Sequence, residues 1–322
     1  MKLFLILPLL LGFILDCILG DPYTMPHPVR AIGTLISKSE TIVRKRFDTT
    51  LRFGGFRLMI GVILLSAGIP ALILLLCYRI NLILGIIIES ILCYYLLAAK
   101  CLKEESMKVY QAIKENNMIQ ARKAVSMIVG RDTQNLDEAG IIRAAVETVA
   151  ENTSDGVTAP LFYMALGGAV GGFFYKAVNT MDSMLGYRNQ KYAEIGFFPA
   201  KTDDVLNYLP SRITALIMIV SAYLLGFDGR NAYRIWKRDR RKHVSPNSAQ
   251  TEAVCAGALH IRLAGDACYF GELHHKPFIG DDDRPVQAED IRRANQLMYL
   301  TSILILILSM ILRICLWGGI FS

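Results

Sequence analysis

Four charged side chains recur every four residues in one segment: Arg143, Glu147, Glu151 and Asp155. This spacing predicts that they lie along one face of a helix, where residues four apart are neighbours. Solvated ion pairs along such a face explain the pattern without a further function. A hard-cation site explains it as well, because Asn152, Ser154 and Asp155 gather oxygen atoms at the helix end, beside an apolar segment.

A second cluster combines acids with bases that suit phosphate. It begins at Asn179 and continues through Asp182 to Arg188 and Lys191. Arg188 offers a planar fork of donors to phosphate and Lys191 a point charge. Asp182 or the later Asp203 can hold Mg²⁺ through phosphate oxygens. Basic side chains also anchor the ends of membrane helices, so a topological role for Arg188 and Lys191 is equally consistent with the pattern.

Prolines border two other polar clusters. In Pro26-His27-Pro28-Val29-Arg30 they restrict the backbone shortly after an apolar segment, and a rigid turn is the ordinary explanation of this pattern. Ser245-Pro246-Asn247-Ser248 predicts a turn followed by a helix that Ser248 caps. Helix capping does not explain why Asn247 and Glu252 occur together before a run of small residues.

A last cluster contains Tyr269 and Lys276. It comes before an acidic run at 281–283 that is typical of a solvated surface.

Membrane helices are the elements that must position these clusters. Of the 322 residues, 53% are apolar, and the mean hydropathy of +0.37 exceeds what a water-facing globular surface tolerates. Crossing roughly 30 Å of hydrocarbon takes about 20 apolar residues. Runs near that length predict spans near residues 3–19, 58–78, 82–99 and 297–316. Weaker or re-entrant segments are expected at 161–178 and 213–227.

The distribution of basic residues predicts the sidedness of these spans. The net charge of +7 comes largely from Lys and Arg beside apolar segments, which favours membrane topology over nucleic-acid binding. Residues 21–57, 100–159 and the basic stretch 230–242 are therefore expected in the cytoplasm. Small residues at Gly167-x-x-x-Gly171 and Gly168-x-x-x-Gly172 predict a face for close helix packing. We expect an all-α, polytopic helical integral membrane protein, one domain over 1–322 with cytoplasmic helical insertions.

Two acidic residues within the predicted spans leave a different class of function open. An ionised Asp16 or Glu89 near the bilayer centre costs about 3 kcal/mol, and such residues often mark an ion pathway. A protonated Glu89 that is hydrogen-bonded to a neighbouring helix explains the same residue equally well. The alternative function from these residues is therefore a membrane transporter.

The clusters together resemble the adenosylcobinamide-phosphate synthase family of cobalamin biosynthesis, the CobD/CbiB family. Five motifs occur in the family's order along nearly the whole chain. They are Gly20-Asp21-Pro22 with Pro26-His27-Pro28-Val29-Arg30, Glu147-Thr148-Val149-Ala150-Glu151-Asn152 with Ser154-Asp155-Gly156, Asn179-Thr180-Met181-Asp182-Ser183-Met184 with Gly186-Tyr187-Arg188, Asp203-Asp204 with Pro210-Ser211-Arg212, and Ser245-Pro246-Asn247-Ser248.

This resemblance implies a reaction. The family joins the free propionate of adenosylcobyric acid to the amine of aminopropanol phosphate, or of a related amino alcohol, in an ATP-dependent amide ligation. A carboxylate lacks a leaving group, so activation through an acyl phosphate is expected. ATP and Mg²⁺ are then needed, without a tightly bound prosthetic group. The resemblance also leaves a corrinoid-binding module as an alternative to the enzyme. The expected partners are the corrinoid, the amino-alcohol phosphate, the lipid bilayer of the cytoplasmic (inner) membrane and other late cobalamin-assembly enzymes, with no nucleic acid and with the active site facing the cytoplasm.

The resemblance also suggests roles for individual residues. Glu147, Glu151 and Asp182 are expected to be catalytic, in metal or nucleotide handling, and the expected metal ligands are Glu151, Asp155 and Asp182. The expected substrate and phosphate contacts are Arg30, Asn152, Arg188, Lys191 and Asn247. His27 is the expected proton acceptor for the attacking amine, because an unperturbed imidazole titrates near neutrality.

Overall fold

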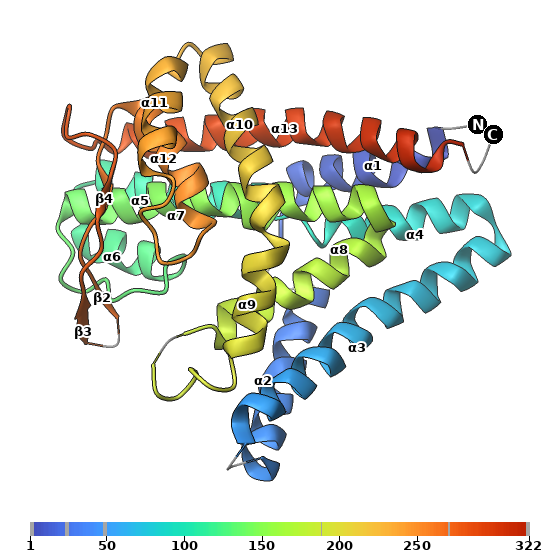
Figure 1. Cartoon of the computed structure of the whole chain (residues 1–322). Coiled ribbons are helices and arrows are strands. Elements are labelled where there is room, and N and C mark those ends of the chain that lie inside the picture. The colour runs from blue at the N-terminus through green and yellow to red at the C-terminus, as the bar shows by residue number, and fades with distance from the viewer. Residues whose placement is uncertain (1–2, 23–25, 48–49, 188, 270, 320–322) are drawn as a thin grey trace. The chain divides into compact units, whose positions relative to one another are not determined.

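The computed structural model describes residues 3–22, 26–47, 50–187, 189–269 and 271–319, and it is almost entirely helical (Figure 1). The chain forms two compact units. The first contains Met1–Ala98, Ala159–Asn207 and Leu306–Ser322, and the second contains Ala99–Thr158 and Tyr208–Ile305. The units interleave along the sequence, and the single domain expected over 1–322 stays a prediction.

The first unit consists of helices, several of which are long and apolar. They are α1 (Leu3–Leu19), α2 (Pro28–Arg46), α3 (Leu51–Ile80), α4 (Leu82–Tyr94), α8 (Ala159–Leu185), α9 (Phe197–Leu206) and the C-terminal part of α13 (Glu289–Trp317). The single residue Asn81 joins α3 to α4, and the chain turns back there (Figure 1). Asn81 Oδ1 accepts a hydrogen bond from Ile83 N at 2.7 Å, which caps α4.

Helix α8 is broken near its middle. Gly167 and Gly168 leave the helical conformation, and Gly168 has φ +61° and ψ −156°, a region that is essentially restricted to glycine. The predicted small-residue packing face is therefore wrong at Gly167 and Gly168, which interrupt the helix instead. It holds at Gly172, where an added Cβ would lie 2.5 Å from Leu96 Cδ1.

Charged side chains satisfy the backbone at this break. Glu89 Oε1 accepts from Ala169 N, at 3.3 Å, and from the Arg313 guanidinium, also at 3.3 Å. Glu89 Oε2 accepts from the Tyr78 hydroxyl at 2.5 Å. Arg313 in turn donates to the carbonyl oxygen of Met164 at 2.8 Å. The buried carboxylate and guanidinium therefore hold the free ends of the two α8 segments.

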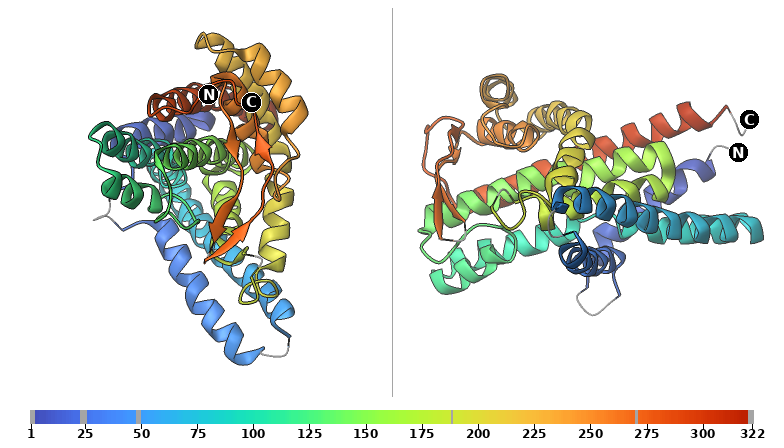
Figure 2. Two further views of the ribbon diagram at one scale, coloured as in Figure 1. Left: turned by 90° about the vertical axis from the view of Figure 1, so that its left-hand side faces the viewer. Right: turned by 60° about the horizontal axis from the view of Figure 1, so that its bottom comes forward.

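The second unit carries the smaller helices and all four described strands. It consists of α5 (Ala99–Lys114), α6 (Met118–Ser126), α7 (Glu138–Asn152), the π-helical turn η2 (Thr153–Thr158), α10 (Tyr208–Leu224), α11 (Gly229–Asp239), α12 (Ser248–Leu259), β1 (Leu263–Ala264), β2 (Ala267–Tyr269), β3 (Glu272–His274), β4 (Phe278–Ile279) and the N-terminal part of α13. The strands form two antiparallel pairs, β1–β4 and β2–β3, which face the viewer in the left view of Figure 2.

Small residues let α12 pack closely inside this unit. All 12 of its residues are buried. A Cβ added at Gly257 would lie 2.8 Å from the Cα atom of Ala232 in α11, so the two helices meet at the glycine backbone. The polar residues of α12 are carried into the interior with the rest of the helix.

The predicted membrane character is confirmed, with adjusted boundaries. Within the described residues, four helical stretches are long and apolar enough to cross a bilayer: Leu51–Ile80, Leu82–Lys114, Glu138–Leu185 and Glu289–Trp317. Helices α9 and α10 pass the same test only together, and α1 is a shorter apolar helix. The span predicted at 82–99 is divided, because α4 ends at Tyr94 and α5 begins at Ala99. The segment expected at 213–227 begins earlier, at Tyr208, and ends at Leu224.

Candidate functional site

A polar cavity of about 120 Å³ lies in the second unit. The loop before α7, the face of α7, the approach to α12, α12 itself and the β2–β4 region all contribute to its wall. The polar and charged side chains that line it are Arg131, Glu147, Thr148, Glu151, Asn152, His243, Glu252, Tyr269 and Lys276. It brings titratable groups together in a space large enough for one small chemical group.

Helix α7 supplies one wall of the cavity. Asp137 is the N-cap of this helix, and its side chain accepts a hydrogen bond from Gly140 N at 2.7 Å. Glu147 and Glu151 then share a helical face, as their spacing predicts, and both line the cavity. The alternative explanation, ion pairs between neighbours on the solvated face of the helix, does not hold for Glu147. Its ion-pair partner is Arg131, which lies outside α7. Its other oxygen accepts from the backbone of Ala264, at 2.7 Å.

Helix α12 supplies the facing wall. Its first residue, Ser248, donates a hydrogen bond to Glu151 Oε1 at 2.6 Å. The prediction that Ser248 caps this helix is wrong, because Asn247 occupies the N-cap position and makes no side-chain cap bond. Asn247 Oδ1 instead accepts from Ser211 and Arg212 of α10, at 3.3 and 3.1 Å.

Glu252 is the most deeply buried acid of the cavity. Only 4% of its surface is exposed, and its Oε2 atom has no hydrogen-bond partner among the described residues. Burial raises the pKa of this carboxyl well above its ordinary value, and the charges of Glu151 and Glu147 raise it further.

The basic groups of the cavity respond differently to burial. Burial lowers the pKa of the His243 imidazole, and His243 Nδ1 accepts from Ser245 N at 3.1 Å. Burial also opposes charge on Arg131, but the neighbouring Glu147 outweighs it and raises the Arg131 pKa. Lys276 Nζ donates to the Tyr269 hydroxyl at 2.7 Å. The cavity therefore combines a firmly charged arginine with an imidazole that favours its neutral form.

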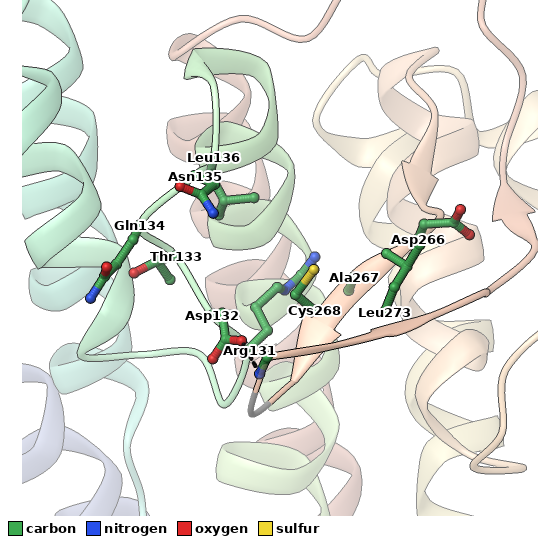
Figure 3. A pocket seen from close by; sticks show the side chains of 11 residues that line it. Arg131, Asp132, Thr133, Gln134, Asn135, Leu136, Asp266, Ala267, Cys268 and Leu273 are labelled. Atoms are coloured by element: carbon green, nitrogen blue, oxygen red, sulfur yellow. Dashed lines mark hydrogen bonds between the residues drawn. The ribbon is translucent and has the colours of Figure 1, made fainter.

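A larger pocket of about 630 Å³ adjoins the same arginine (Figure 3). It lies between the 131–136 loop and the β2–β3 hairpin, and Arg131 lines both this pocket and the polar cavity. Asp132 fastens the loop to the hairpin, since its backbone N donates to the Cys268 carbonyl at 2.9 Å and its carboxylate accepts from Gly271 N at 2.8 Å.

The sequence-predicted site residues are divided between the two units. Glu147, Glu151 and Asn152 line the polar cavity. Asp155 lies in η2, half-buried, directly after α7, and Asn247 contacts α10. The remaining described residues, His27, Arg30, Asp182 and Lys191, belong to the first unit. Arg188 lies outside the described residues.

Within the first unit, His27 and Arg30 line a pocket of about 540 Å³. His27 Nδ1 accepts from Val29 N at 3.2 Å and caps α2, while Nε2 lies 3.1 Å from the Asp21 carboxylate. Asp182 is in the last turn of α8. Lys191 lies over the ring of Tyr192, 4.8 Å from its centroid. The proton-acceptor role of His27 stays a prediction.

The oxygen donors of the second unit bear on the expected Mg²⁺. Magnesium is usually held by one or two carboxylates together with substrate phosphates. Glu151 and Asp155 suit that chemistry, whereas Asp182 belongs to the first unit. Across the described ranges, no group of three or more His, Cys, Asp or Glu side chains is arranged to hold a metal ion. The assignment of Glu151, Asp155 and Asp182 as magnesium ligands stays a prediction.

Comparison with known proteins identifies the family. Residues 9–298 match the family model described as CobD/Cbib protein. The chain belongs to the CobD/CbiB family. It is 47% identical over 305 residues to cobalamin biosynthesis protein CobD of Clostridium perfringens, covering 95% of this chain and 97% of the relative. The CobD protein of Klebsiella pneumoniae is 45% identical over 310 residues (96% and 97%), and that of Listeria monocytogenes 44% over 292 residues (90% and 93%). No solved structure matches the chain significantly.

Sequence reasoning did not assign several residues of the cavity: Arg131, His243, Glu252, Tyr269 and Lys276. His243 and Glu252 flank the Ser-Pro-Asn-Ser motif, and Tyr269 and Lys276 stand before the acidic run, so proximity to these clusters was the available signal. Arg131 carries no such signal. Its pairing with Glu147 depends on how the loop before α7 folds back on the helix.

Proposed function

We propose that this chain acts in cobalamin biosynthesis, the process that its relatives' names state. Family membership over residues 9–298 supports this role. The identities of 44–47% extend over at least 90% of the chain in the three relatives described, so the likeness includes both units.

We propose more specifically that the chain is an ATP-dependent amide ligase. It joins adenosylcobyric acid to aminopropanol phosphate, or to a related amino-alcohol phosphate, and forms adenosylcobinamide phosphate. The observation that carries this proposal is a contact between two family motifs at the polar cavity. Glu151, of the motif that begins at Glu147, accepts a hydrogen bond from Ser248, of the Ser-Pro-Asn-Ser motif.

The chemistry needs both acidic and basic groups. In the first step the γ-phosphoryl group of ATP is transferred to the corrinoid carboxylate, which gives an acyl phosphate and ADP. The unprotonated amine nitrogen then attacks the acyl carbon and loses one proton to a general base. The amide bond forms, and phosphate leaves with the electron pair of the broken C–O bond. Cationic side chains such as Arg30 and Lys191 stabilise charge that develops on phosphate. Mg²⁺, held by carboxylates with phosphate oxygens, supplies further charge neutralisation when bound.

The proposal includes a cellular setting. The enzyme lies in the cytoplasmic membrane with its active site towards the cytoplasm, where ATP is available. The basic loops beside the apolar helices support this orientation. The bilayer, the corrinoid and the amino-alcohol phosphate are its partners, and other late cobalamin-assembly enzymes are candidates for association.

The contacts of Glu89 support a structural role for this residue more than a role in transport. Both of its carboxylate oxygens accept hydrogen bonds within the first unit, from Tyr78, Ala169 and Arg313. An acid that is paired with arginine and fixed to a helix break suits a structural role better than carriage of an ion.

Reconstitution tests the proposed ligase directly. Purified protein in detergent or nanodiscs is incubated with adenosylcobyric acid, ATP, Mg²⁺ and aminopropanol phosphate. We expect adenosylcobinamide phosphate, one ADP and one phosphate per turnover, and no product when any one component is omitted. Protein that is folded and binds corrinoid but yields no product with all components present would contradict the proposal.

A further inference from the structure

Glu252 is a buried acid that lacks a matching charge. It lies on α12, is 4% exposed, and lines the polar cavity. Its Oε2 atom has no hydrogen-bond partner within the described part of the chain. A carboxylate in such a position is unfavourable unless it is protonated or receives a partner from outside the protein.

The neighbouring acids have partners of their own. One oxygen of Glu147 is paired with Arg131 and the other accepts from Ala264 N. Glu151 accepts from the Ser248 hydroxyl. Among the glutamates of this cavity, Glu252 is therefore the one with a buried oxygen that has no hydrogen-bond partner in the described part of the chain.

The charges that line the cavity do not balance. Three glutamates, Glu147, Glu151 and Glu252, face two basic side chains, Arg131 and Lys276. His243 does not supply the missing charge, because burial favours its neutral form. With all three glutamates ionised, one negative charge is uncompensated. Burial therefore favours the protonated form of Glu252 in the empty cavity, and a bound cation stabilises its ionised form.

The size of the cavity limits what that ligand can be. About 120 Å³ admits a small group but excludes a corrin ring or a nucleotide. A primary ammonium is compact, carries one positive charge and has three donors for oxygen acceptors. Among the substrates of the proposed reaction, the amino-alcohol phosphate has such a group, on the carbon next to the one that carries its phosphate.

We propose that this cavity binds the primary ammonium group of the amino-alcohol substrate and that Glu252 is the carboxylate that receives it. The inference rests on the proposed function for the identity of the substrate. The charge and size of the cavity support a small cation, and the substrates of the proposed reaction identify that cation as a primary ammonium. Glu252 then binds the ammonium group, which becomes the nucleophile once it has lost a proton. Glu252 is not among the residues that we assign to ATP or Mg²⁺.

The test compares Glu252→Gln with a matched control, Glu272→Gln. Glutamine keeps the size of Glu252 but removes its charge, and Glu272 is an exposed acid on β3 of the same unit. For Glu252→Gln we expect the KM for aminopropanol phosphate to rise roughly 10- to 100-fold, as the loss of a charged hydrogen bond implies. The KM values for ATP and the corrinoid should stay within about twofold of wild type, as should all constants of Glu272→Gln.

A binding experiment separates this inference from the proposed function. Calorimetry with 1-amino-2-propanol, which carries the ammonium but no phosphate, needs no turnover. Binding to wild-type protein that is lost in Glu252→Gln, retained in Glu252→Asp and unchanged in Glu272→Gln supports the ammonium site even if the ligase assay fails. Thermal unfolding of each variant shows whether it is folded.

Three results would overturn the inference. The first is equal binding of 1-amino-2-propanol to wild type and folded Glu252→Gln. The second is a Glu252→Gln variant that changes the Mg²⁺ requirement and leaves the KM for the amine unaltered, which would make Glu252 a metal ligand. The third is a similar rise in all three KM values, which would indicate a structural role.

Discussion

The hydroxyl of Ser248 donates a 2.6 Å hydrogen bond to Glu151, a residue 97 positions earlier in the chain. The bond joins the first turn of α12 to the last turn of α7 at the polar cavity. A serine at a helix start ordinarily bonds to its own backbone, so this contact diverts it to a second helix. It orients one of the three cavity glutamates.

Ser248→Ala should therefore affect activity more than stability. Loss of one hydrogen bond to a carboxylate costs about 1.5 to 3 kcal/mol where the acceptor stays buried, but Glu151 is half-exposed and solvent can replace the donor. We expect kcat/KM to fall roughly tenfold and the melting temperature to change little. Ser126→Ala, which removes an exposed hydroxyl from α6, is the control. Wild-type kinetics in Ser248→Ala would show that the contact does not orient Glu151 for the reaction.

The Arg131–Glu147 ion pair predicts that mutations of its two residues change the free energy of unfolding non-additively. Both side chains are largely buried, at 14% and 9% exposure. Arg131→Met leaves Glu147 buried without its cation, which should lower the free energy of unfolding by about 3 to 5 kcal/mol. The double variant Arg131→Met/Glu147→Gln should recover much of that loss. Chemical unfolding of the two single variants and the double variant measures the coupling, and simple additivity would contradict the pairing.

The break in α8 predicts that Gly168 cannot be replaced. An alanine Cβ there would lie 2.3 Å from Glu89 Oε1, in a backbone conformation that disfavours any side chain. We expect Gly168→Ala to lower the apparent melting temperature of the detergent-solubilised protein by several degrees, from a cost of about 1 to 3 kcal/mol. Gly61→Ala in α3 is the matched control, because its Cβ meets nothing within 4 Å. Equal melting temperatures for the two variants would show that α8 is not broken in this way.

Asp239 predicts a loss of stability in acid. Its side chain is fully buried, and hydrogen bonds from Arg238, Lys242 and Gly280 N overcome the effect of burial and lower its pKa to about 2. A depressed carboxyl pKa adds stability above the unfolded-state value and loses it as the pH falls. The contribution, about 2 kcal/mol, should be complete above roughly pH 5 and disappear between about pH 4 and pH 2.

Unfolding measured from pH 6 to pH 2 in wild type and Asp239→Asn checks this prediction. The difference between the two proteins should shrink as the pH falls through that window. Asp282→Asn, at an exposed acid, controls for the general effect of acid on the protein. A difference that is constant across the range would refute the predicted linkage.

Sidedness provides a test of the cellular setting. Cysteines introduced near Arg44, Lys114 and Arg240, in a background without reactive native cysteines, should resist an impermeant thiol reagent in intact cells. They should react once the membrane is permeabilised. Labelling of any one of them in intact cells would contradict the cytoplasmic placement of its loop.

The local sequence was sufficient for the class of protein and for part of the site. Apolar runs predict membrane helices because hydrophobicity and length are properties of a contiguous segment. The four-residue spacing predicts that Glu147 and Glu151 share a face, because the helical period acts over a few residues. Both predictions are met by α7 and by the helical stretches that can cross a bilayer.

Tertiary structure decided which distant groups meet these residues. Ala264 reaches Glu147 across 117 positions, and Arg131, not the helical neighbour Arg143, becomes the partner of Glu147. Gly168 interrupts α8 where Glu89 and Arg313 satisfy the exposed backbone, although its local pattern resembles a packing face. Such contacts depend on how separate segments pack around one core, and no local period specifies that packing.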